Sequence, residues 1–311
     1  QSLILMVMSR PKLFVLTGPT AVGKTELSLQ MAEFLHCPII SADSRQMFAD
    51  LPIGTAAPTA AQLARVPHHF VGNLALTDYY SAARFEEEAL QVCEHHFADH
   101  DALVMSGGSM MYVDALCRGI DPLPTISEAV RTKLYARLEQ EGLPVLLREL
   151  EERDPAYFAR VDVQNAKRVV HALEIIYESG KRVSELLTGA VKERPFDIVK
   201  IGLQRPREEL FTRINERVTM MVEEGFLAEA ERVLPFRELN ALNTVGYKEI
   251  FRYFDGDWAL DMALDRMRKN TRVFAKKQMT WLNKDTSVLW YDANDTKGVM
   301  RLIEETMLAS K

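Results

Sequence analysis

Short apolar runs that end in polar or glycine-containing segments alternate with helical patterns in the first third of the chain. The runs are KLFVLTG (12–18), CPIISADS (37–44) and DALVMSGGS (101–109), and a helical pattern covers residues 24–35. Buried runs of this kind are typical of parallel strands that are covered by helices on both faces. Ligands of such sheets bind at the carboxyl ends of the strands, and all three polar segments would lie there.

The pattern changes after RGIDPLP (118–124) and becomes helical and rich in charge, with few candidate strands up to about residue 187. One helix is expected after a Ser127 N-cap and ends at Gly142, and another ends at Gly180. Strand-like runs return only near Asp197–Gln204 and Ser287–Ala293.

These changes predict an α/β core that is interrupted by a helical insertion. We expect the first part of the core in residues 1–120, the insertion in 121–194 and the return to the core in 195–311.

Composition limits the class of protein. The chain has 311 residues, of which 47% are hydrophobic and 26% charged, and its net charge of -6 argues on average against a nucleic-acid binder. A local basic face can nevertheless coexist with an acidic whole. The three separated cysteines favour a reducing cytoplasm over a disulfide framework. Neither a membrane span nor a signal peptide is expected, since no apolar run is long enough and the first ten residues have no basic region.

The strongest signal is the Gly-x-x-x-x-Gly-Lys-Thr spacing of residues 18–25, between a predicted strand and a predicted helix. Glycines allow backbone N–H groups to converge on phosphate oxygens, and the helix start adds a positive dipole end. Lys24 can neutralise a phosphate, and the Thr25 hydroxyl is placed to bind Mg²⁺. We therefore predict a P-loop NTPase-like core. The motif alone does not say whether the loop holds a nucleoside triphosphate or another diphosphate.

Two further strand ends carry candidate chemistry. Asp43 could act as a general base, help to hold Mg²⁺, or cap the next helix. The glycine pair of SGGSMMY (106–112) could approach a ligand or simply make a turn. The third run has no acidic residue, which argues against an ordinary ATPase.

Residues 266–284 contain seven Lys/Arg residues and no Asp or Glu. Met267, Phe274 and Trp281 recur every seven residues and predict one apolar stripe on a helix. The segment is either the solvated face of an ordinary helix or a surface for phosphate backbone with aromatic rings for stacking. The adjacent His68 and His69 have no partner at ligand spacing, so we expect a structural role for them.

Taken in order, ten segments of the chain resemble one enzyme family. They are LTGPTAVGKTELS, IISADSRQMF, LPIGTAAPT, VPHH, YSAARF, SGGSMMYVDAL, DPLP, LFTRINERVTMMVEEG, NTVGYKEI and TRVFAKKQMTWL. This series is similar to the bacterial form of the tRNA dimethylallyltransferases, also called tRNA isopentenyltransferases, from about Pro11 to Trp281. The resemblance implies transfer of a dimethylallyl group from dimethylallyl diphosphate to N6 of the adenosine immediately 3′ of the anticodon. The substrates would be tRNAs that read codons beginning with U, with Mg²⁺ assisting as diphosphate leaves.

The resemblance also implies roles for individual residues. The catalytic positions would be Asp43, which accepts the N6 proton or hydrogen-bonds the amine, together with Thr25 and Arg217. The donor diphosphate would contact Gly18, Thr20, Ala21, Val22, Gly23, Lys24, Thr25 and Arg217. The tRNA, through its anticodon stem-loop, would contact Asp43, Ser44, Arg45, Gln46, Ser109, Arg131, Lys167, Arg168, His171, Gly246, Tyr247, Lys248, Lys276, Lys277, Gln278 and Trp281.

Three positions depart from the family pattern, and one of them, Val163 in place of a common proline, has little consequence for the chemistry. Ser109 replaces a usual threonine but keeps the hydroxyl, whereas Ala57 replaces a usual lysine and would weaken one phosphate or tRNA contact.

Three alternatives remain: a P-loop kinase of a small metabolite or nucleotide, a prenyltransferase of free adenine nucleotides, and an RNA-binding protein that uses a nucleotide as a switch. The basic segment and the helical insertion favour a macromolecular acceptor, and nothing in the sequence requires more than a monomer.

Overall fold

The computed structural model describes residues 10–309. The expectation about the first ten residues therefore lies almost wholly outside the described range. Within that range, no helix combines the length and the apolar character needed to cross a membrane.

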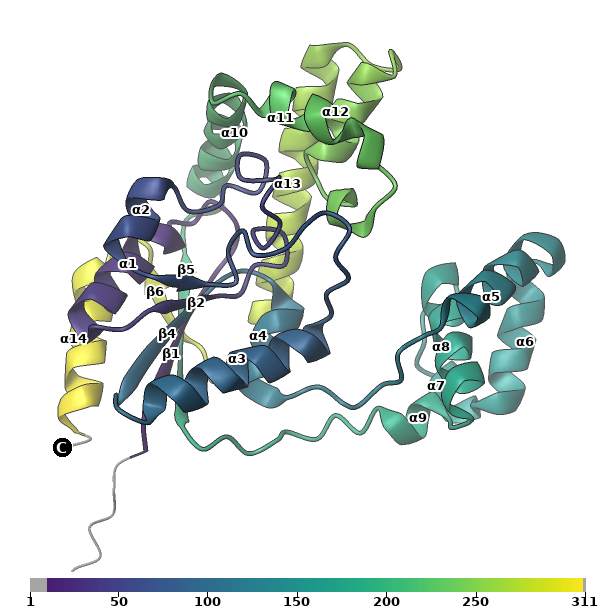
Figure 1. Cartoon of the computed structure of the whole chain (residues 1–311), viewed down its shortest axis with the longest axis horizontal. Helices are drawn as coiled ribbons and strands as arrows, with labels where there is room; N and C mark the ends of the chain where they lie inside the picture. Colours follow the sequence, from purple (N-terminus) through teal and green to yellow (C-terminus); the bar gives the residue numbers. More distant parts are fainter. Residues whose placement is uncertain (1–9, 310–311) are drawn as a thin grey trace, which may run out of the picture. The chain divides into compact units, whose positions relative to one another are not determined.

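A single parallel sheet forms the centre of the core (Figure 1). Its strand order is β3-β2-β4-β1-β5-β6, and every neighbouring pair is parallel. The strands are β1 (Lys12–Thr17), β2 (Ile39–Ser41), β3 (His68–His69), β4 (Ala102–Ser106), β5 (Asp197–Gln204) and β6 (Leu289–Asp292). The predicted parallel α/β sheet is thus confirmed.

Five of these strands were predicted from apolar runs, and β5 has the predicted bounds. The sixth, β3, consists only of His68 and His69, which is too short to give a periodic signal. The structural role expected for this pair is confirmed, since both residues pair with β2 and His68 Nδ1 lies 2.8 Å from the Val66 carbonyl oxygen.

The register brings three strand ends together. Leu16 of β1 pairs with Ser106 of β4, and Ser41 of β2 pairs with the same residue from the other side. Beyond the strands, the Ala42 amide donates to the Ser106 carbonyl, and the Ser109 amide donates to the Ala42 carbonyl. The P-loop, Asp43 and the glycine pair therefore leave the sheet at one edge, as parallel topology requires.

Helices surround the sheet in this part of the chain. The first of them, α1, packs on β4 and against the last helix, and α3 also packs on β4. The helices are α1 (Lys24–Leu35), α2 (Ala60–Arg65), α3 (Ala82–Phe97), α4 (Met110–Arg118), α10 (Arg207–Glu223), α11 (Phe226–Val233), η1 (Leu234–Phe236), η2 (Asn240–Leu242), α12 (Tyr247–Phe254), α13 (Leu260–Leu282) and α14 (Thr296–Leu308). The long helix α13 packs against both α10 and α12.

The chain divides into two compact units, and residues 118–192 form the second of them. The helices of this unit are α5 (Glu128–Glu141), α6 (Leu143–Arg153), α7 (Pro155–Phe158), α8 (Ala166–Ser179) and α9 (Val183–Leu186). The Ser127 hydroxyl accepts from the Val130 amide, which confirms the predicted N-cap of α5, and Gly142 and Gly180 end α5 and α8 as expected. The unit has its own apolar core, built around Leu134, Leu146, Leu150 and the buried face of α8.

Candidate active site

The P-loop joins β1 to α1 and is closed on itself by Lys24. Gly23 is the N-cap of α1 with φ of 115°, a backbone conformation that glycine adopts without a steric penalty. Lys24 Nζ donates to the carbonyl oxygens of Gly18 and Pro19, each at 2.9 Å. The lysine amine therefore lies over the loop, where the phosphate oxygens of a bound ligand would meet it.

Side chains from distant segments hold the loop from outside. Arg213 Nε of α10 donates to the Ala21 carbonyl at 2.8 Å, and Arg205 Nε donates to the Val22 carbonyl at 2.7 Å. One turn further along α10, Arg217 Nη1 donates to the Thr20 hydroxyl at 3.4 Å. The structure thus places Arg217 beside the P-loop, whereas its contact with a diphosphate stays a prediction.

Sequence reasoning missed Arg205 and Arg213. The spacing of Arg213 and Arg217, four residues apart on one face of α10, was the available signal for Arg213. Arg205 precedes the helix and gave no comparable signal, because its contact with the loop depends on how β5 ends.

Burial and neighbouring charge shape the electrostatics of this cluster. The pKa of Lys24 falls from 10.5 to about 8, first because of burial and then because of Arg217, while Asp43 opposes the change. Burial also lowers the pKa of Arg217, and Asp43 again opposes it. The site thus concentrates positive charge around one carboxylate, which suits a ligand with several negative charges.

Asp43 has one of the roles left open by the sequence, and its geometry is compatible with a second. Its Oδ1 accepts from the backbone amides of Arg45 at 2.9 Å and Gln46 at 3.2 Å, so it caps the turn after β2. Its Oδ2 has no hydrogen bond among the described residues and stays available as a proton acceptor. Capping by one oxygen therefore orients the other, which reconciles the capping and the general-base interpretations.

The residues after Asp43 are tied to other segments. Arg45 Nη1 donates to the Asn240 carbonyl at 2.6 Å, and burial lowers the pKa of Arg45. Gln46 Nε2 donates to the carbonyls of Thr55 at 3.2 Å and Ala56 at 3.1 Å. Both amide hydrogens of Gln46 are thereby used, so the group that it can still offer a ligand is the acceptor Oε1. Ser44 and Ser109 are partly exposed at the same edge.

Three residues expected to touch tRNA are buried in this structure, namely Gly246, Tyr247 and Gln278. Tyr247 is fully buried, and its hydroxyl donates to Glu229 Oε1 at 2.6 Å. Gln278 is 3% exposed; its Oε1 accepts from the Thr20 amide and its Nε2 donates to the Gly108 carbonyl, each at 2.9 Å. The polar atoms of the Tyr247 and Gln278 side chains are thus hydrogen-bonded to other groups inside the protein. Their neighbours Lys248 and Lys277 are exposed, and Gly246 is buried.

Glu229 is a further residue that the sequence did not single out. Its carboxylate is 1% exposed and accepts from the amides of Ile53 at 2.9 Å and Gly54 at 2.8 Å, besides the Tyr247 hydroxyl. It fixes the loop whose next two carbonyls, of Thr55 and Ala56, hold the Gln46 amide. The loop also contains Ala57.

The basic helix α13 differs from its predicted pattern. Met267 is 3% exposed as expected, but Phe274 is 41% exposed, so the stripe predicted at seven-residue spacing is wrong. The buried positions are Ala263, Met267, Ala275, Gln278 and Leu282. The buried face rotates along the helix because α13 packs against both α10 and α12.

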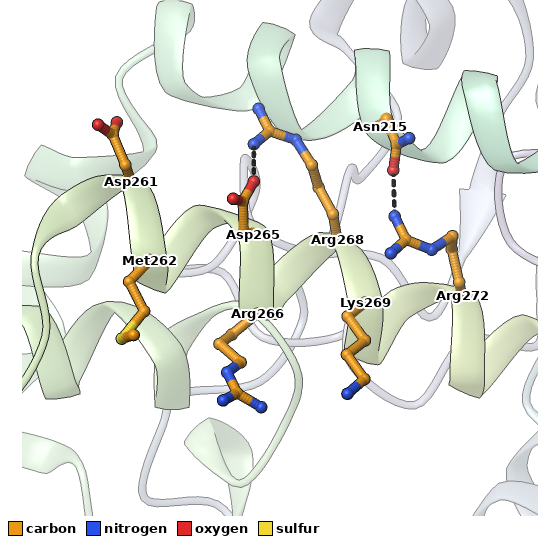
Figure 2. Close-up of a pocket in the computed structure, with 8 residues that line it drawn as sticks. All are labelled: Asn215, Asp261, Met262, Asp265, Arg266, Arg268, Lys269 and Arg272. Carbon is orange, nitrogen blue, oxygen red and sulfur yellow. Dashed lines mark hydrogen bonds and ion pairs between the residues drawn. The ribbon is translucent and has the colours of Figure 1, made fainter.

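An open groove of about 730 Å³ lies along α13 beside α10. Figure 2 shows Arg268 directed to Asp265, with which it forms an ion pair, and Arg272 directed to Asn215. Lys269 extends from the helix without touching the other residues drawn. Lys276 lies 5.6 Å from the centre of the Phe211 ring on α10. Local contacts thus hold Arg268, Arg272 and Lys276 on this surface, whereas Lys269 is exposed.

The helical unit brings four of the predicted tRNA-binding residues to its surface. Lys167, Arg168 and His171 are exposed on α8, and Arg131 is exposed on α5. Glu174, whose side chain is 4% exposed, joins two of them: Arg131 Nε lies 3.3 Å from Oε1, and His171 Nδ1 lies 2.9 Å from Oε2. This buried carboxylate sets the positions of both the Arg131 and the His171 side chains.

The described residues contain no group of three or more His, Cys, Asp and Glu side chains arranged to hold a metal ion. Thr25 is exposed at the start of α1, and its hydroxyl has no hydrogen-bond partner among the described residues. A single hydroxyl beside a phosphate site suits Mg²⁺, which keeps several waters and takes further ligands from phosphate oxygens.

Comparison with known proteins gives a consistent picture. A family model described as IPP transferase matches residues 46–285. A tRNA dimethylallyltransferase 1 of Phocaeicola vulgatus is 54% identical over 291 residues, which are 94% of this chain and 97% of the relative.

Solved structures agree. The full-length tRNA isopentenylpyrophosphate transferase of Bacillus halodurans is 32% identical, with a TM-score of 0.70 and 97% of both chains covered. A eukaryotic dimethylallyltransferase, described in snapshots of its action on tRNA, is 26% identical with a TM-score of 0.78 over 92% of this chain and 75% of that one.

Proposed function

Because this chain belongs to the IPP transferase family, we propose that it transfers a dimethylallyl group from dimethylallyl diphosphate to a tRNA. The acceptor is N6 of the adenosine immediately 3′ of the anticodon, in tRNAs that read codons beginning with U, and diphosphate is released. The single observation that carries the proposal is the meeting of Lys24, Arg217 and Asp43 at one edge of the sheet.

The chemistry needs a stabilised leaving group, since an adenine amine is a weak nucleophile. A bond forms between N6 and the allylic carbon, and the bond from that carbon to the diphosphate oxygen breaks. Lys24, Arg217 and the amides at the start of α1 meet the negative charge that develops on the diphosphate. Asp43 Oδ2 accepts the proton that N6 loses, because Oδ1 is already committed to two backbone amides.

Mg²⁺ would be held by the Thr25 hydroxyl together with the diphosphate oxygens and water. When bound it supplies further charge neutralisation for the departing diphosphate.

The tRNA reaches the site with its target base out of the stack, since an adenine within a stacked anticodon loop cannot meet a donor in the P-loop. Exposed Lys and Arg side chains, together with the exposed His171, would contact its phosphates. These residues are Arg131, Lys167, Arg168 and His171 in the helical unit, and Lys248, Lys276 and Lys277 in the core. We expect Gln46 Oε1, Ser44 and Ser109, which are partly exposed, to contact the base. We expect the enzyme to act as a monomer in the cytoplasm.

The test is incubation of the protein with labelled dimethylallyl diphosphate, Mg²⁺ and unmodified tRNA. Label is expected in the tRNA at one adenosine, and a tRNA with guanosine at that position is the matched control. Absence of label, together with phosphoryl transfer from ATP to a small acceptor, would establish the kinase alternative instead. Labelling of free adenine nucleotides but not of tRNA would establish the nucleotide prenyltransferase.

A further inference from the structure

Gln278 lies in the most basic segment of the chain, yet its side chain points into the protein. It is the single polar side chain on the buried face of α13, where its neighbours are Ala275 and Leu282. Burying an amide is unfavourable unless its donors and acceptors are paired. The contacts that it makes there therefore need an explanation.

Its two polar atoms reach the two loops that flank the phosphate site. Oε1 accepts from the Thr20 amide of the P-loop, and Nε2 donates to the Gly108 carbonyl of the glycine pair after β4. The two contacts join segments 258 and 170 residues away from Gln278 along the chain. One planar amide thus sets the distance between both loops.

Thr20 is the residue at which these constraints meet. Its amide is held by Gln278 on α13, and its hydroxyl accepts from Arg217 on α10. With the Thr20 N–H directed to Gln278, the loop presents its later amides, at the start of α1, to a phosphate. Release of that N–H would allow the peptide to rotate, and the loop would then have to be ordered again when a ligand binds.

The Gln278 amide, with its hydrogen bonds to Thr20 and Gly108, forms a clamp between the two loops. The space around Gly108 shows how closely this clamp fits. A Cβ at this position would lie 2.5 Å from Gln278 Nε2 and 3.4 Å from the Gly18 carbonyl oxygen. Only a residue without a side chain allows the amide to approach the loop. The glycine is thus required by the clamp as well as by the turn.

We infer that Gln278 is a positioning residue for the diphosphate, and that it does not contact tRNA. This inference rests on the proposed function and deepens it, because it concerns the diphosphate half of the same site. The basic segment thereby has two faces with separate tasks. Its exposed lysines meet the acceptor, and its buried glutamine orders the loop that binds the donor.

The test measures binding of inorganic pyrophosphate with Mg²⁺ by calorimetry, without tRNA. Gln278→Met keeps the length of the side chain and removes both hydrogen bonds. We expect affinity for pyrophosphate to fall about tenfold, the equivalent of one to two lost hydrogen bonds. The affinity for an unmodified anticodon stem-loop, measured without donor, is expected to change less than about twofold. Lys277→Ala is the contrasting variant, with the opposite pattern, and Val273→Ala on the same helix is the neutral control for pyrophosphate binding.

Gly108→Ala gives a second approach that does not depend on the folding of Gln278→Met. Its Cβ displaces the Gln278 amide, so pyrophosphate affinity should fall here too. The double variant should bind no more weakly than the weaker single variant, because both remove one clamp. Unchanged pyrophosphate affinity with weakened stem-loop binding, or additive losses in the double variant, would overturn the inference. Neither result depends on prenyl transfer, so failure of the proposed function would be recognised separately.

Discussion

Replacement of Lys24 by methionine tests how much the buried positive charge of this lysine destabilises the folded protein. The effect of the charge depends on pH, whereas the loss of the hydrogen bonds that Lys24 donates depends little on pH. In the folded protein Lys24 is surrounded by Arg217 and by the loop, and its pKa is lowered from 10.5 to about 8. In the unfolded chain the pKa of Lys24 has its ordinary value of 10.5. The unfolded state therefore binds more protons between pH 8 and 10.5, and the free energy of unfolding of the wild type rises with pH across that window.

The size of the effect follows from the two pKa values. The lowered pKa of Lys24 destabilises the folded state by about 3 kcal/mol at pH 7 and by about 1.4 kcal/mol at pH 9.5. The wild type should thus gain about 2 kcal/mol relative to Lys24→Met between pH 7 and 9.5. The two carbonyls of Gly18 and Pro19 that lose their donor weaken the variant as well, but at a magnitude that depends little on pH.

The assay is urea unfolding of both proteins, without phosphate, at half-unit steps from pH 7 to 9.5. Lys277→Met removes an exposed lysine from α13 and serves as the matched control, for which we expect a curve parallel to that of the wild type. Parallel curves for wild type and Lys24→Met would refute the electrostatic reasoning. A free energy of unfolding of the wild type that rises relative to that of Lys24→Met as the pH increases from 7 to 9.5 supports it. The same charge argument predicts that pyrophosphate binds more weakly as pH rises above about 8.

Three further predictions address the base, the buried loop support and the helix α13. Asp43→Asn should abolish prenyl transfer while tRNA binding in a filter assay persists, because capping needs only one oxygen and proton acceptance needs the carboxylate; equal loss of both would make Asp43 a recognition residue. Tyr247→Phe should lower the free energy of unfolding by about 2 kcal/mol in urea, since the Glu229 carboxylate loses a buried donor; an unchanged midpoint would contradict this. Met267→Ala should destabilise by about 2–5 kcal/mol and Phe274→Ala by less than about 0.5 kcal/mol, and equal losses would restore the seven-residue stripe.

Much of the fold follows from patterns that are local in the sequence. The apolar runs of β1, β4 and β5 identify buried strands, and the Gly-Lys-Thr spacing after β1 identifies a phosphate loop at the start of a helix. Ser127 and Gly142 mark the ends of α5. Each of these signals is read within about twenty residues, the range over which strand and helix periodicity acts.

The buried faces of helices were less predictable. A repeat of seven placed Phe274 on the packed side of α13, but the helix packs against α10 and α12 along different parts of its length. Similarly, Tyr247 lies in a motif-rich segment and yet is fully buried beneath the loop of Gly54. Periodicity gives the existence of a helix, whereas its partners decide which side is covered.

The amino-acid sequence by itself determined the strands, the phosphate loop and the residue types that can neutralise a diphosphate or accept a proton. Only the tertiary structure decided which distant side chains complete the site. Arg213 and Arg217 reach the P-loop from α10, Glu229 holds a loop 175 residues away, and Gln278 turns inward from a basic helix to join Thr20 to Gly108. The physical reason is that these hydrogen bonds depend on the packing of whole helices on the sheet, and no pattern of neighbouring residues specifies that packing.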